Sequence, residues 1–114
     1  MSNLKKSNIK VKIMTNENNI PESINWSAED GGVDNAGAKA MIMSFWDEKE
    51  QNAMRIDLWT KEMTVDEMKK FFHQTLLTMA DTFERATAEK NITEDLRDYC
   101  QHFAEKMNIL PPLS

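Results

Sequence analysis

The sequence contains little of what stabilises a secreted protein or anchors a membrane protein. Its 114 residues include one cysteine, Cys100. No disulfide can therefore form within the chain, which favours a reducing cytoplasm. No apolar run approaches the roughly 20 residues of a membrane-spanning helix, and the basic start at Lys5 and Lys6 is followed by polar residues instead of the apolar segment of a signal peptide. We therefore expect a cytoplasmic protein with no export signal and no segment inserted in a membrane.

Positive charge is also scarce. Fourteen Lys and Arg residues stand against 19 Asp and Glu, a formal net charge of -5, so no broad positive field is available to hold a phosphate backbone. We expect no binding to nucleic acid. The chain has only three Gly and three Pro, and 40% of its residues are hydrophobic, a composition typical of a globular domain. This length predicts a single domain over residues 1–114, with loose ends at 1–7 and 109–114.

Alternation of apolar and polar residues predicts four half-buried strands. The alternating segments are 8–14, 24–28, 39–46 and 54–59. An Asn-rich turn joins the first two into a hairpin, and the polar turn at 47–51 joins the last two into a second one. The segment 39–46 has large apolar groups in both phases, so a helix is its rival interpretation. The break at Glu29–Gly32 and the polar stretch that follows it predict a long loop over residues 29–37.

Two helices are predicted after the strands. Thr64 and Glu67 have the spacing of a capping box, which satisfies backbone amides in the first turn of a helix. An apolar stripe follows at helical spacing, and a second cap region at 91–93 introduces another. The stripes are Val65, Met68, Phe72, Leu76, Met79, Phe83 and Ala86, then Ile92, Leu96, Tyr99, Phe103 and Met107. This order predicts an α+β fold: a four-stranded antiparallel sheet of two hairpins, with both C-terminal helices packed on one of its faces.

The sequence shows no arrangement of residues that indicates a reaction. Cys100 and His102 lie close together and His73 precedes them, but this spacing matches no zinc motif, so we expect no metal, no cofactor and no catalytic residues. The loop of Glu29, Asp30, Gly31 and Gly32 could hold a cation with its carboxylates or an anion with its glycines. It lacks the spacing of a phosphate-binding loop or a calcium loop. Our second hypothesis is a small-molecule or metal-binding module that uses this loop with His73. The simpler interpretation is a mobile loop that binds no ligand.

Two tryptophans suggest a contact surface. Trp46 and Trp59 lie in predicted strands, opposite in phase to the apolar sets expected to face the helices. With Ala40 and Ile42 they would form an apolar strip on the open face of the sheet, flanked by Arg55, Lys10 and Lys12. Exposed apolar patches rimmed by charge often mark contact surfaces, where Trp and Arg are favoured anchors. The alternative is that a bulge shifts the phase, or that the long loop covers both rings.

Several longer segments carry a resemblance to a known family. They are Trp26–Gly32, Ala38–Met41, Arg55–Lys61, Val65–Lys69, Phe71–Thr75 and Met79–Thr87. With these strings the chain resembles the gliding-motility protein GldC family, from about Ile9 to Met107. The resemblance implies a small soluble protein of gliding bacteria that is associated with movement over surfaces, and it implies no reaction.

Together, these observations predict a non-enzymatic accessory or adaptor protein associated with gliding motility. We expect it to bind a protein partner of the motility apparatus, or a second copy as a homodimer, through the open sheet face. Trp46, Trp59, Arg55 and Ile42 are the residues expected to make that contact.

Overall fold

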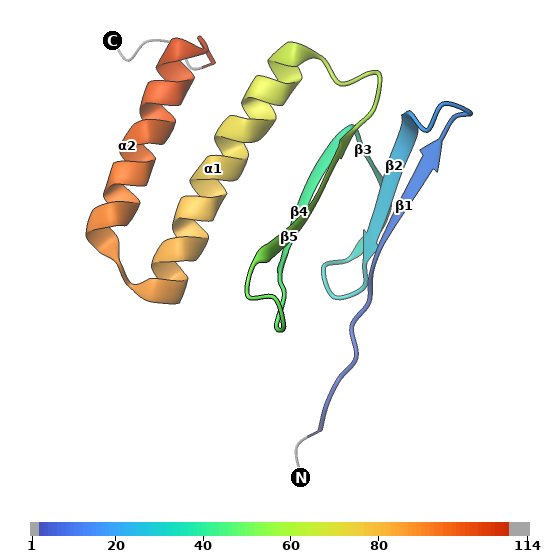
Figure 1. Cartoon of the computed structure of the whole chain (residues 1–114), viewed down its shortest axis with the longest axis horizontal. Coiled ribbons are helices and arrows are strands. Elements are labelled where there is room, and N and C mark those ends of the chain that lie inside the picture. Colours follow the sequence, from blue (N-terminus) through green and yellow to red (C-terminus); the bar gives the residue numbers. More distant parts are fainter. Residues whose placement is uncertain (1–2, 110–114) are drawn as a thin grey trace. The chain divides into compact units, whose positions relative to one another are not determined.

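The computed structural model describes residues 3–109 and shows an α+β chain, as predicted (Figure 1). It divides into a strand unit, Met1–Met63, and a helical unit, Thr64–Ser114. The elements are β1 (Ile9–Thr15), β2 (Pro21–Ala28), β3 (Val33–Ala38), β4 (Ala40–Trp46), β5 (Ala53–Trp59), α1 (Val65–Thr87) and α2 (Lys90–Lys106). Of the ends predicted to be loose, residues 3–7 and 109 carry no regular secondary structure, while 1–2 and 110–114 lie outside the described residues.

The first predicted hairpin is confirmed as β1 and β2 of a three-stranded antiparallel sheet. Val11 pairs with Trp26 and Ile13 with Ile24, so the apolar residues of both strands share one face because side chains alternate along a strand. Ile24, on the central strand, is only 2% exposed. The apolar face of this sheet is therefore centred on Ile24.

The prediction of a long loop over 29–37, and with it the single four-stranded sheet, is wrong. Residues 33–38 form β3, which pairs with β2, so the chain has a three-stranded sheet and a two-stranded sheet. β3 has the sequence VDNAGA, which lacks the aromatic residues and, after Val33, the β-branched residues that usually mark a strand. Backbone pairing forms the strand instead, together with a hydrogen bond from the Asn35 amide to Ser27 Oγ.

The second predicted hairpin is confirmed as β4 and β5, and the helical alternative for residues 39–46 is excluded. The two strands pair in an unbroken antiparallel register from Ala40 opposite Trp59 to Trp46 opposite Ala53. Asp47 closes the turn, because its side chain accepts from the Glu50 amide and its own amide donates to the Asn52 carbonyl. Only Lys39 separates β3 from β4 along the chain.

The predicted capping box begins α1. Thr64 Oγ1 accepts from the Glu67 amide at 3.0 Å, and the Thr64 amide donates to Glu67 Oε1 at 3.1 Å. The helix ends at Thr87 and is capped by Ala88, which has a left-handed conformation with a φ of 59° and whose amide donates to the Glu84 carbonyl.

The predicted start of the second helix is wrong by one turn. α2 begins at Lys90, without a side-chain cap, so the residues expected to cap it lie inside the helix. Thr93 is fully buried there and its hydroxyl donates to the Glu89 carbonyl at 2.7 Å. A threonine bonded back to the preceding turn has the same sequence signature as a threonine cap.

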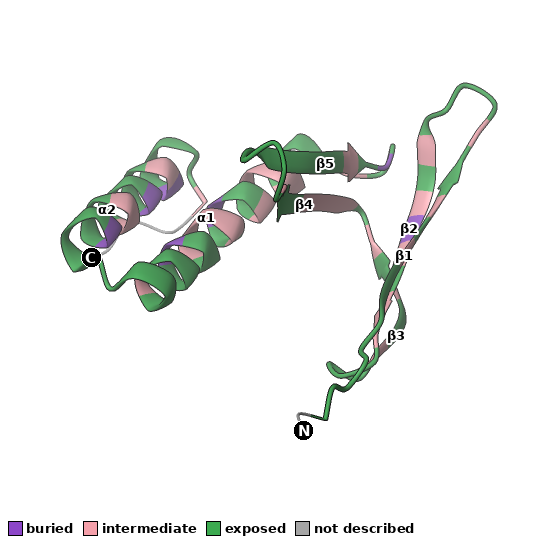
Figure 2. Cartoon of the chain, turned by 60° about the horizontal axis from the view of Figure 1, so that its bottom comes forward, coloured by how far each residue is buried: buried purple, intermediate pink, exposed green. Residues whose placement is uncertain are grey.

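The two helices pack side by side through small residues. Ala80 of α1 and Thr93, Cys100 and Ala104 of α2 are completely buried, and Figure 2 shows the few buried positions as purple bands on both helices. Burial raises the pKa of the Cys100 thiol. The packing of these helices on a sheet face stays a prediction.

Arg97 of α2 reinforces the contact between the helices. Its guanidinium binds Asp81 at 3.0 Å and Glu84 at 2.8 Å, both on α1, and Glu94 at 2.8 Å on its own helix. These three carboxylates raise the pKa of Arg97. Among residues 3–109, no helix combines the length and apolarity needed to cross a membrane.

Replacing Thr64 with Ala should destabilise the helical unit, because the Glu67 amide loses its acceptor. We expect a loss of about 1 kcal/mol in the free energy of unfolding, measured by urea denaturation followed by circular dichroism. The control Thr64→Ser keeps the hydroxyl and should remain close to the original protein. Equal losses in both variants would show that the cap does not contribute.

Glu22 should give the strand unit a measurable dependence on acid pH. Its carboxylate accepts from Lys61 at 2.8 Å and from Asn16 at 3.1 Å, and these bonds lower its pKa from the ordinary 4.5. The stabilisation is therefore present above pH 4.5 and is lost as pH falls through the lowered value. Glu22→Gln should melt at a lower temperature than the original protein at neutral pH, and the difference should shrink below pH 4.5. A difference that stays constant on acidification would contradict this assignment.

Candidate functional site

The β4–β5 hairpin presents two faces of different chemistry. The register places alternate residues of both strands on one side. The Trp face consists of Ala40, Ile42, Ser44, Trp46, Ala53, Arg55, Asp57 and Trp59. The Met face consists of Met41, Met43, Phe45, Met54, Ile56 and Leu58. Because the register has no bulge, Trp46, Trp59, Ile42 and Arg55 lie on the same face.

The two tryptophans stand at opposite ends of the Trp face. Trp59 lies opposite Ala40, and Trp46 lies six residues further along β4, which at the usual strand rise separates them by about 20 Å. Trp46 is 67% exposed and Trp59 is 57% exposed. Large aromatic side chains are thus offered to solvent at both ends of one strand pair.

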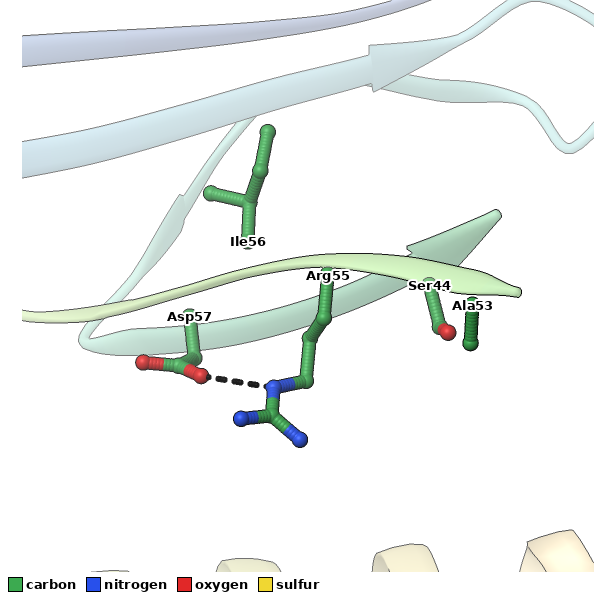
Figure 3. Close-up of a pocket in the computed structure, with 5 residues that line it drawn as sticks. All are labelled: Ser44, Ala53, Arg55, Ile56 and Asp57. Carbon is green, nitrogen blue, oxygen red and sulfur yellow. Dashed lines mark hydrogen bonds and ion pairs between the residues drawn. The ribbon is translucent and has the colours of Figure 1, made fainter. Parts of the chain in front are cut away.

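The centre of the Trp face is polar, and it interrupts the apolar strip of Ala40, Ile42, Trp46 and Trp59. Arg55 Nε donates to Asp57 Oδ2 at 3.0 Å, and Asp57 lies directly across from Ile42. Figure 3 shows Arg55, Asp57, Ser44 and Ala53 on the same side of the strands, around an open hollow. Both side chains of the ion pair are exposed, and an exposed pair adds little to stability. The two charges are therefore available to a partner.

The expected lysine rim does not belong to this hairpin. Lys10 and Lys12 are residues of β1, in the three-stranded sheet. Alternation places them on the face of that sheet opposite Val11 and Ile13. Of the cations proposed to flank the tryptophans, Arg55 is the one on the Trp face.

The Met face carries six apolar side chains and no charge. Ile56 points away from Arg55 and Asp57 in Figure 3, and together with Phe45 and Met54 it remains half-exposed. This is the set that the sequence assigns to the helices. Both faces of the hairpin therefore offer apolar groups, and only the Trp face combines them with charge.

The loop of the second hypothesis is a four-residue turn between β2 and β3. Glu29 Oε1 accepts from Asn8 Nδ2 at 3.1 Å, which holds the segment before β1 against the turn. Gly32 has a φ of 67°, where a glycine is favoured, and its amide donates to the Glu29 carbonyl. Asp30 is exposed. Glu29 and Gly32 thus have structural roles in the turn, and ligand binding by this loop stays a prediction.

His73 lies in α1 of the helical unit. It is 6% exposed, and its ring stacks on Phe103 of α2 with the ring centres 6.3 Å apart. Cys100 is buried nearby in the same helix contact. Across residues 3–109, no three His, Cys, Asp or Glu side chains gather as a metal ion would require.

Sequence reasoning missed Asp57 and Ser44, which share the Trp face with the predicted residues. The missing information was the cross-strand pairing. Because Asp47 and Asn52 close the turn, Trp46 must face Ala53, and counting back along both strands places Asp57 opposite Ile42. A hairpin register counted from its turn would have identified the ion pair at the centre of the face.

Comparison with known proteins identifies the family of the chain. The family model described as gliding motility-associated protein GldC-like matches residues 21–109. No curated protein and no solved structure matches the sequence. The matched region begins with β2 and includes every later strand and both helices, and the chain therefore belongs to the GldC-like family of gliding motility-associated proteins.

Proposed function

We propose that this protein is a non-enzymatic cytoplasmic adaptor of gliding motility, which captures a protein partner through the Trp face. The observation that carries the proposal is the pair of exposed tryptophans at the two ends of that face, with the Arg55–Asp57 ion pair between them. The association with motility comes from the family.

The shape of the Trp face favours a protein over a small molecule. Small-molecule sites are concave and bury most of the ligand, whereas the hollow beside Arg55 is open and lies on an exposed strand pair. Tryptophan and arginine dominate the binding energy of many protein interfaces. Trp46 and Trp59 are separated by about 20 Å, a span that suits an extended protein surface.

The ion pair gives the face a means of selecting its partner. Arg55 and Asp57 lie on the same strand two residues apart and are opposite in charge, so a partner is attracted if it places a carboxylate beside Arg55 and a cation beside Asp57, and repelled if it places them in the reverse order. Like charges facing each other across an interface cost affinity and exclude incorrect partners. The tryptophans would thus supply affinity, and the ion pair would fix the orientation of the partner on the Trp face.

Replacing Trp46 and Trp59 with Ser should abolish capture of the partner and leave the fold intact. Tagged protein expressed in a gliding host is used to isolate the partner, and the affinity of the purified pair is then measured by calorimetry. Each single substitution should weaken binding about 30-fold, since an anchor contributes about 2 kcal/mol or more. Met14→Ser, which removes an exposed apolar side chain from β1, is the matched control. Equal binding by the double variant, or its unfolding, would overturn the proposal.

Iodide quenching of tryptophan fluorescence separates a foreign partner from a second copy on the same face. Variants that retain only Trp46 or only Trp59 are measured over a concentration series. Quenching at every concentration leaves the face free for another protein. Protection that appears on concentration would instead show self-association through the Trp face.

A further inference from the structure

Both helices carry large apolar side chains that their mutual contact leaves partly or largely exposed. On α1, Val65, Phe72, Met79 and Phe83 lie about a quarter turn from Ala80, which is buried against α2, at 100° of rotation per residue. On α2, the corresponding residues are Ile92, Tyr99 and Phe103, again about a quarter turn from the buried Thr93, Cys100 and Ala104, and Met107 follows at the end of the helix.

These two sets lie on the same side of the helix pair. The helices are antiparallel neighbours, joined at Ala88 and Glu89. Along the right-handed rotation of each helix, its set lies just before the residues that contact the other helix. Because the two helices run in opposite directions, the two sets fall on the same side of the helix pair. Phe103 lies at the edge of the helix contact, because its ring stacks on His73 of α1, and its ring centre is 6.5 Å from that of Tyr99. We name the surface formed by these eight residues the helix face.

The helix face is large enough for a stable interface. Seven of its residues are exposed large hydrophobics, from 36% for Met107 to 72% for Val65. At roughly half exposure of side chains of 150–250 Å², they offer on the order of 700 Å². A pair of such faces would bury roughly 1,400 Å², which is within the range of specific protein interfaces.

The composition of the helix face fits a second copy of itself. None of its eight residues is charged, so two identical faces would not repel each other.

We propose that the helix face binds the helix face of a second copy, so that two helix pairs form a four-helix dimer. Such a contact is isologous, with the same residues on both subunits. It would cover the large side chains that the small-residue contact at Ala80 and Cys100 leaves outside. The inference does not rest on the proposed function, because it uses none of the residues of the Trp face.

Sedimentation of the full chain over a concentration series tests the proposal. The original protein should have about twice the monomer mass of 13.2 kDa. Met79→Glu should weaken the dimer by roughly 100-fold, since it places a charge in the contact of both copies. Gln74→Glu introduces the same charge on the side of α1 away from the helix face, and it should leave the mass unchanged. Circular dichroism establishes that both variants keep their helices.

A second measurement does not depend on any variant folding. Copies grown in light and heavy nitrogen are mixed and cross-linked through lysine, and mass spectrometry identifies the links between copies. Links joining Lys69, Lys90 or Lys106 of the two helices support the proposal. A monomer at every concentration would show that another surface covers the helix face, and a dimer linked only through Lys49 of the strand unit would place the contact elsewhere. Either result overturns it.

Discussion

The close contact between α1 and α2 decides which side chains the helical unit can bury. Ala80, Thr93, Cys100 and Ala104 allow the helices to approach closely, and Arg97 then reaches Asp81 and Glu84 across the contact. Apart from His73 and Phe103, whose rings stack between the helices, this close contact leaves little room for large side chains. The large apolar residues of both helices are consequently placed beside the contact, where they form the helix face.

The β4–β5 hairpin has a comparable excess of apolar surface. A two-stranded sheet is marginal by itself, and this one has tryptophan on one face and methionine, phenylalanine and isoleucine on the other. Both faces keep large side chains that are at least half exposed. The Arg55–Asp57 pair distinguishes the two faces, because charge at the centre of a contact favours selective binding over non-specific burial.

Sequence patterns identified the elements that obey simple periodicity. The alternation of Val11 and Ile13 predicted β1, and the Thr64 and Glu67 spacing predicted the start of α1 to the residue. Residues 33–38 were not predicted as a strand, because β3 is held by backbone pairing and its sequence has almost no strand preference. For the candidate site, phase placed Trp46 and Trp59 on one side, but Asp57 became visible only through pairing across strands. Patterns along one strand contain no information about its neighbour.

The burial of Cys100 makes the helix contact observable by chemistry. Its thiol is fully enclosed, and burial raises its pKa, so little of the reactive thiolate forms and reagents cannot reach it in the closed structure. Modification must then wait for the helices to separate. With a single cysteine in the chain, the rate of alkylation becomes a direct measure of how often this helix pair opens.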